Sequence, residues 1–147
     1  IVNKGAEIFY KELEGADSAT LKLIAEENED DRLFSEFISK ELTDLEKWYS
    51  ENPESVAKDE EARTTRLNEI HDHFNKDLAP RLKTTVYAKF TKEKMNNARM
   101  GLYKTYMQNL NDFEDAYKRH GSDLLKFIDV VKKLESSKDP ETDLKSL

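Results

Sequence analysis

The sequence predicts an all-α protein, a compact irregular bundle of six to seven helices of unequal length. Gly and Pro are scarce, with four and three residues among 147. Charged residues make up 37% of the chain, against roughly 25% in ordinary domains, and such a composition is typical of long solvated helices. Apolar residues recur at three- and four-residue steps, the period of an α-helix, and no stretch has the alternation of a strand.

Breakers and capping residues divide these periodic stretches into separate helices. Gly15 follows the first stretch, and Asn52 precedes a proline and therefore avoids the helical conformation. Gly121 is a C-terminal stop, and Ser122 or Asp123 can cap the helix that follows. The expected helices cover about 4–13, 18–26, 33–49, 53–77, 80–90, 98–117 and 124–134.

Polar stretches predict where these helices are joined and where packing is weak. Glu29-Asp30-Asp31 indicates a joint between the second and third helices, and residues 57–65 are expected to project or to pack poorly. From Glu135 the chain turns polar and is expected to fray. We therefore expect one helical domain over 1–135 and a polar C-terminal tail over 136–147.

Composition also excludes several classes of function. The net charge is −7 and the pI is about 5.1, whereas a general nucleic-acid binder needs a basic surface. The chain has no Cys, which removes disulfides and thiol chemistry, and no apolar run long enough for a transmembrane segment. The sequence begins at Ile1, which indicates a processed or an artificially chosen start, and is compatible with a removed signal peptide.

The polar residues do not form a catalytic or metal motif. His71 and His73 lie two apart, so on a helix they point about 200° away from each other and cannot share one metal. The carboxylate pairs Glu26/Glu27, Asp30/Asp31 and Glu60/Glu61 stand in charge runs that are expected to be solvated, where acid–base catalysis is not favoured. No serine lies beside a glycine-rich turn. These observations predict a protein that is not an enzyme and that has no cofactor and no metal.

Aromatic residues are a distinctive feature of this chain. Seven Phe, six Tyr and one Trp are spread over the predicted helices and lie mostly on the apolar stripes. They can fill a core, or some of them can line an interhelical cavity for an apolar ligand. A filled core and a lined cavity use the same residue types, so the sequence leaves both interpretations open.

Short motifs along the chain resemble one known family. Residues 8–13 read Ile-Phe-Tyr-Lys-Glu-Leu, and residues 19–28 read Ala-Thr-Leu-Lys-Leu-Ile-Ala-Glu-Glu-Asn. Further motifs are Leu78-Ala79-Pro80-Arg81-Leu82-Lys83, Ala98-Arg99, Lys104-Thr105-Tyr106, Leu110-Asn111 and Lys126-Phe127-Ile128. In this order they resemble the nematode fatty-acid- and retinol-binding proteins. Residues 29–66 do not align with that family, and His120-Gly121-Ser122 stands where it often has Phe-Pro.

The resemblance implies a secreted, non-enzymatic carrier that binds fatty acids or similar small apolar lipids, such as a retinoid, between its helices. Burial of the acyl chain supplies the affinity, and Lys83, Lys89 and Arg99 are candidates for the carboxylate head group. The candidate apolar lining is Phe9, Leu21, Phe34, Phe37, Ile38, Val86, Phe90, Leu102, Tyr106, Leu110, Phe127 and Ile128.

Two other functions remain open at this point. The first is a secreted module that binds a host or partner protein through a helix face, with Trp48 and Tyr49 next to Pro53 as candidate anchors. The second is a reversible lipid-surface binder similar to exchangeable insect apolipoproteins, which calls for longer and more regular amphipathic helices.

Overall fold

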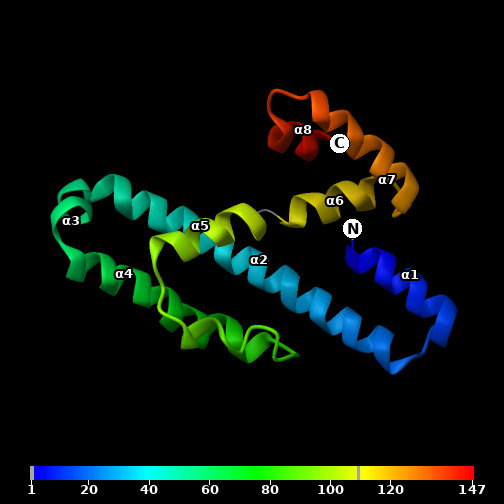
Figure 1. Ribbon diagram of the computed structural model, residues 1–147, viewed down its shortest axis with the longest axis horizontal. Helices are drawn as coiled ribbons and strands as arrows, with labels where there is room; N and C mark the ends of the chain where they lie inside the picture. Colours follow the sequence, from blue (N-terminus) through cyan, green and yellow to red (C-terminus); the bar gives the residue numbers. More distant parts are fainter. Residues whose placement is uncertain (1, 109) are drawn as a thin grey trace. The chain divides into compact units, whose positions relative to one another are not determined.

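A computed structural model describes the backbone of residues 2–108 and 110–147, with all side chains in these ranges except those of residues 2, 3 and 111. The described residues form eight α-helices and no strand, which confirms the all-helical class and adds to the expected six or seven helices (Figure 1). The helices are α1 (Val2–Glu14), α2 (Ala19–Glu51), α3 (Pro53–Lys58), α4 (Glu60–His73), α5 (Asn97–Tyr106), α6 (Leu110–Arg119), α7 (Leu124–Val131) and α8 (Pro140–Ser146). None of them, among the residues described, is long and apolar enough to cross a membrane.

Contacts divide the chain into two compact units. The central unit comprises residues 25–108, and the terminal unit comprises residues 1–24 with 109–147. The assignment of residues 1–135 to one domain and of 136–147 to a tail stays a prediction.

The helix α2 is continuous through Glu29-Asp30-Asp31, where the sequence predicted a joint. Asp30 is fully buried, and its carboxylate accepts hydrogen bonds from the backbone N–H groups of Lys83 and Thr84 at 2.9 and 2.7 Å. Asp31 accepts a hydrogen bond from the hydroxyl of Tyr87 at 2.6 Å. These acidic residues bind a segment that is distant in the sequence. Their carboxylates therefore have hydrogen-bond partners within the protein, and the helix continues through them.

Residues 82–89 are not helical, although their apolar spacing predicted a helix over 80–90. Leu82 has an extended backbone, with φ −72° and ψ 141°, and the contacts with Asp30 and Asp31 hold the following residues against α2. The segment forms turns and ends in a 3₁₀ turn over Phe90–Lys92.

Two more expected helices are divided in the structure. Asp59 ends α3 in an extended conformation, and its side chain caps α4 by accepting from the N–H of Ala62 at 2.9 Å. The chain then changes from α- to π-helical hydrogen bonding over Phe74–Leu78 and to a 3₁₀ turn over Ala79–Arg81, so the expected helix over 53–77 is two helices and an irregular end. The expected helix over 98–117 is likewise divided into α5 and α6.

The core of the central unit is built around Phe34, which is fully buried. Its ring stacks on Tyr87 with centroids 4.0 Å apart and meets Phe90 and Tyr103 edge-on at 5.3 and 5.5 Å. Ile38 and several other apolar side chains of α2, α4 and α5 complete this core. Because these rings pack directly on one another, they fill the core at these positions and do not line a cavity.

The terminal unit has a second, smaller core. Ala116, Phe127 and Leu144 are its buried residues, and they come from α6, α7 and α8. The predicted stop and cap between α6 and α7 are confirmed, because Gly121 has a φ of 73° and Asp123 accepts from the first N–H groups of α7. The expected fraying beyond Glu135 is wrong, since α8 forms there and presents an apolar side chain to this core.

Replacing Leu144 by alanine is expected to lower the free energy of unfolding by about 2 kcal/mol, because its side chain is only 4% exposed. Urea unfolding followed by circular dichroism measures the change. The matched control is Leu125→Ala on α7, where the side chain is 76% exposed and the expected loss is below about 0.5 kcal/mol. Equal losses for the two variants would show that α8 does not contribute its leucine to the core.

Candidate functional site

The side chains predicted to bind a lipid are divided between the two units of the chain. Five of them belong to the terminal unit, namely Phe9, Leu21, Leu110, Phe127 and Ile128, and the other ten belong to the central unit. Of these ten, Phe34, Phe37, Ile38 and Phe90 are part of the core or packed against it, whereas Val86, Leu102 and Tyr106 are exposed.

The three predicted head-group cations differ in their surroundings. Lys83 and Lys89 are exposed, and Lys83 is fixed only through its backbone N–H on Asp30. Arg99 lies over the rings of Phe90 and Tyr103 at 5.6 Å from each centroid, and it donates to the Tyr103 hydroxyl at 3.1 Å. Arg99 therefore serves the packing of the central core.

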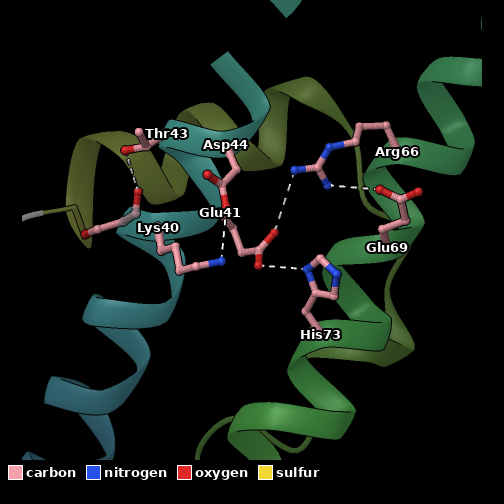
Figure 2. Close-up of polar contacts among 8 residues, drawn as sticks. Lys40, Glu41, Thr43, Asp44, Arg66, Glu69 and His73 are labelled. Atoms are coloured by element: carbon pink, nitrogen blue, oxygen red, sulfur yellow. Dashed lines mark hydrogen bonds and ion pairs between the residues drawn. The ribbon is translucent and has the colours of Figure 1, made fainter. Parts of the chain in front are cut away.

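A different set of polar side chains does converge, between α2 and α4 of the central unit. Figure 2 shows this set, the Glu41 cluster, which consists of Glu41, Arg66, Glu69 and His73. An oxygen of the Glu41 carboxylate lies 2.8 Å from Nδ1 of His73, and its other oxygen lies 3.9 Å from a guanidinium nitrogen of Arg66. Arg66 also pairs with Glu69 at 3.4 Å. One buried acid thus contacts a base and a cation from the facing helix.

Helical periodicity brings these residues together. Glu41 stands on the stripe of α2 that also holds Ile38, Leu42 and Leu45, so its side chain is directed inward and is only 2% exposed. On α4, Arg66 and His73 are seven residues apart, which is two turns, and they share one face of the helix. Because the chain reverses at α3, α4 runs back in the direction opposite to α2 (Figure 1). The contacts of Arg66 and His73 with Glu41 then join the two helices.

The burial of Glu41 requires polar partners for its carboxyl group. An unpaired buried carboxylate is costly, and the hydrogen bond to His73 and the charge of Arg66 offset part of that cost here. The Oε2 atom of Glu41, 3.9 Å from Arg66, has no hydrogen-bond partner among the described residues. Nδ1 of His73 is in position to donate a hydrogen bond to an ionised Glu41, an arrangement that leaves Nε2 as the outer ring nitrogen. The His73 side chain is 43% exposed. A histidine oriented in this way can accept a proton from water.

An open pocket of about 530 Å³ lies beside the Glu41 cluster and shares Arg66 and Glu69 with it. Its walls come from the end of α2, the break before α4 and the first turns of α4. The lining residues are Trp48, Asp59, Glu61, Ala62, Thr65, Arg66 and Glu69. We call this the α4 pocket. Several of its lining residues belong to the segment 57–65, which was expected to project or to pack poorly.

The two neighbouring histidines have different environments, as their spacing on a helix predicted. The ring of His71 meets Phe90 edge-on at 5.5 Å, and burial together with the charge of Arg99 lowers the pKa of His71. His73 instead contacts Glu41. No group of three or more His, Cys, Asp or Glu side chains that could hold a metal ion occurs in the part of the chain that the structure describes.

The Glu41 cluster was not predicted from the sequence, although the sequence contains one signal for it. The stripe read on α2 ran through Phe34, Ile38 and Leu45, and the same period passes through Glu41. A single acid on an otherwise apolar stripe must find a partner, and a histidine or arginine on another helix is the natural one. Such a mismatch points to a buried polar site without naming its partner.

Comparison with known proteins gives one match. A model of the Aminopep family, described as "Putative aminopeptidase", matches residues 1–145. No curated protein and no solved structure matches.

This match corrects several sequence-based predictions. The resemblance to nematode fatty-acid- and retinol-binding proteins is wrong, and so are the lipid carrier and the secreted interaction module that were inferred as functions. The expectation that the chain is not an enzyme is contradicted as well. The motifs behind the resemblance consist of residues common in any charged helix, which explains how they misled. Secretion and the expected partners stay predictions.

Proposed function

The chain belongs to the Aminopep family, and from this membership we propose that it hydrolyses the first peptide bond of peptides with a free amino terminus. The observation that supports the proposal is an acidic pocket lined largely by α4, the helix that also carries His73 in contact with Glu41. Glu69, the acidic lining residue one helical turn before His73, offers a partner for the amino terminus, and the histidine offers a base for the attacking water.

The charge of the α4 pocket suits an ammonium group. Asp59, Glu61 and Glu69 contribute three carboxylates to its lining, and Arg66 contributes one cation. A free amino terminus carries a positive charge at neutral pH, whereas an acetylated one does not. Recognition of that charge distinguishes removal of the first residue from cleavage within a chain.

The Glu41 cluster supplies groups for the hydrolysis itself. Nε2 of His73 takes a proton from water while the water oxygen bonds to the carbonyl carbon of the peptide bond. The same nitrogen returns the proton to the departing amine as the carbon–nitrogen bond breaks. Glu41 holds the ring and stabilises its positive charge between these two steps.

Arg66 is suited to stabilise the oxygen on which charge develops. Its side chain lines the α4 pocket, and its buried Nη1 atom pairs with Glu69 at 3.4 Å. A fixed cationic donor near a developing oxyanion lowers the barrier of acyl transfer. The ion pairs with Glu41 and Glu69 hold the guanidinium in place.

Hydrolysis of amino-acid p-nitroanilides tests the proposal. We expect cleavage of substrates with a free amino group and at least about tenfold slower cleavage of their N-acetyl counterparts, because acetylation removes the charge that the pocket recognises. Release of p-nitroaniline is followed by absorbance. Equal rates for the two forms, or no cleavage across a panel of apolar, acidic and basic residues, would contradict the proposal.

A further inference from the structure

We propose that His71 acts as a pH switch: its neutral ring holds residues 82–96, the connecting segment, against α4, and protonation of the ring releases that segment. The switch lies on a different face of α4 from the one that carries His73, and it does not depend on the proposed hydrolysis. It rests on a buried ring nitrogen without a hydrogen-bond partner and on a cation beside the phenyl ring that His71 contacts.

An apolar contact of His71 joins α4 to the connecting segment. The ring of His71 meets the ring of Phe90 edge-on, with centroids 5.5 Å apart. Phe90 is only 3% exposed, and its ring also packs on Phe34 and Phe74 at centroid distances of 5.3 and 4.6 Å. The connecting segment is therefore fixed at Phe90 to the central core and to α4 together.

The surroundings of His71 suit a neutral ring and not an imidazolium. Its Nε2 atom is buried and has no hydrogen-bond partner among the described residues. Both nitrogens of a protonated histidine carry a hydrogen, so Nε2 becomes a donor that needs an acceptor. A buried donor without an acceptor loses its hydration and gains nothing in return. Protonation therefore favours a ring that leaves its contact with Phe90 and reaches water.

The charges around His71 act mainly in the same direction. Arg99 of α5 lies over the ring of Phe90, 5.6 Å from its centroid, and burial together with the charge of Arg99 lowers the pKa of His71. Asp72, the next residue of α4, opposes this with a smaller effect. Glu93 of the connecting segment pairs with Arg99 at 3.2 Å. The cations of the connecting segment are exposed, namely Lys83, Lys89, Lys92 and Lys94.

The lowered pKa of His71 gives the direction of the switch. A histidine in the unfolded chain takes up a proton near pH 6.5, whereas folded His71 does so only at lower pH. Between these two values the unfolded chain binds more protons, so stability falls as the pH falls. The contact is thus fully stabilising above about pH 6.5 and weakens in mild acid.

Amide hydrogen exchange at about pH 7.5 and about pH 5.5, on either side of the ordinary pKa of histidine, tests this proposal. The amides of Phe90 and Lys92 donate to the carbonyl oxygens of Tyr87 and Lys89 at 2.9 and 3.1 Å, so their exchange reports opening of the connecting segment. We expect their protection factors to fall at least about fivefold at the lower pH, which is the smallest effect of one buried donor without an acceptor.

His71→Leu should keep the same protection factors at both pH values, because leucine occupies the place of the ring without an ionisable group. The matched control is His120→Gln on α6, which removes a histidine outside the central unit and should leave the pH dependence unchanged. An equal fall in His71→Leu, or no fall in the unchanged protein, would overturn the proposal.

Titration of the His71 ring by NMR gives a second readout, which needs no replacement of His71 itself. In the unchanged protein the ring should take up its proton below the ordinary pKa of histidine, and Arg99→Gln should move this titration to higher pH because a neighbouring positive charge is lost. Asp72→Asn should move it in the opposite direction. A His71 ring that titrates as in an unfolded chain, or that does not respond to Arg99→Gln, contradicts the proposal.

Discussion

Replacing His73 by asparagine is expected to lower kcat for hydrolysis of free-amino substrates by about 10²- to 10⁴-fold, the usual contribution of a general base. The amide nitrogen of asparagine can take the place of Nδ1 and donate to Glu41, so the buried carboxylate keeps a partner. Asparagine has no group that can accept a proton from water. Steady-state kinetics with an aminoacyl p-nitroanilide measure the loss, and KM should change little.

The control is Asn68→Ala, an exposed position on α4 outside both the Glu41 cluster and the pocket lining. Its kcat should match that of the unchanged protein, which also excludes a contaminating peptidase as the source of activity. Glu41→Gln should reduce kcat less than His73→Asn, because glutamine can still accept from Nδ1 but carries no charge. An asparagine variant with full activity would remove His73 from the mechanism.

Local features of the sequence predicted the helix ends well. The breaks at Gly15 and at Asn52-Pro53 and the stop at Gly121 appear in the structure where the sequence places them. Each of these depends on one or two residues whose backbone preference is intrinsic, such as the positive φ of 86° at Gly15. Interactions of that range can be read from the chain without knowledge of the fold.

Features that depend on distant residues could not be predicted in this way. The acidic run at 29–31 has the composition of a solvated joint, and only its contacts with residues more than 50 positions away make it part of a helix. The apolar spacing over 80–90 likewise predicted a helix, yet the contacts of Lys83, Thr84 and Tyr87 with α2 hold this segment in turns. Tertiary contacts here override local propensity.

The candidate site shows the same limit. Arg66 and His73 look like ordinary solvated residues in a polar helix, and the pocket lining looks like a charge run. The role of Arg66 and His73 in the site depends on Glu41, which stands 25 and 32 positions earlier in the chain (66 − 41 and 73 − 41). The apolar residues were a poor guide for a related reason: a packed aromatic core and a lipid cavity use the same side chains, and Phe34 proved to be packed on other rings.

Replacing Asp30 by alanine is expected to lower the free energy of unfolding by about 3–4 kcal/mol. The carboxylate accepts from two backbone N–H groups and from the Thr84 hydroxyl at 2.7–2.9 Å, and hydrogen bonds to a charged acceptor contribute about 1.5–3 kcal/mol each, though not additively. Their loss frees the segment that holds Tyr87 on Phe34, so packing is weakened together with the hydrogen bonds. Urea unfolding measures the global effect.

Hydrogen exchange at the amides of Lys83 and Thr84 distinguishes this clamp from a general loss of stability. In Asp30→Ala these two amides should lose protection even under conditions where the core amides of α2 remain protected. The matched control is Glu29→Gln, one residue earlier, where the carboxylate pairs with Arg32 at a site 38% exposed and the expected loss is below about 1 kcal/mol. If the alanine and glutamine variants unfold at the same urea concentration, Asp30 does not hold the 82–89 segment, and the absence of a helix there needs another cause.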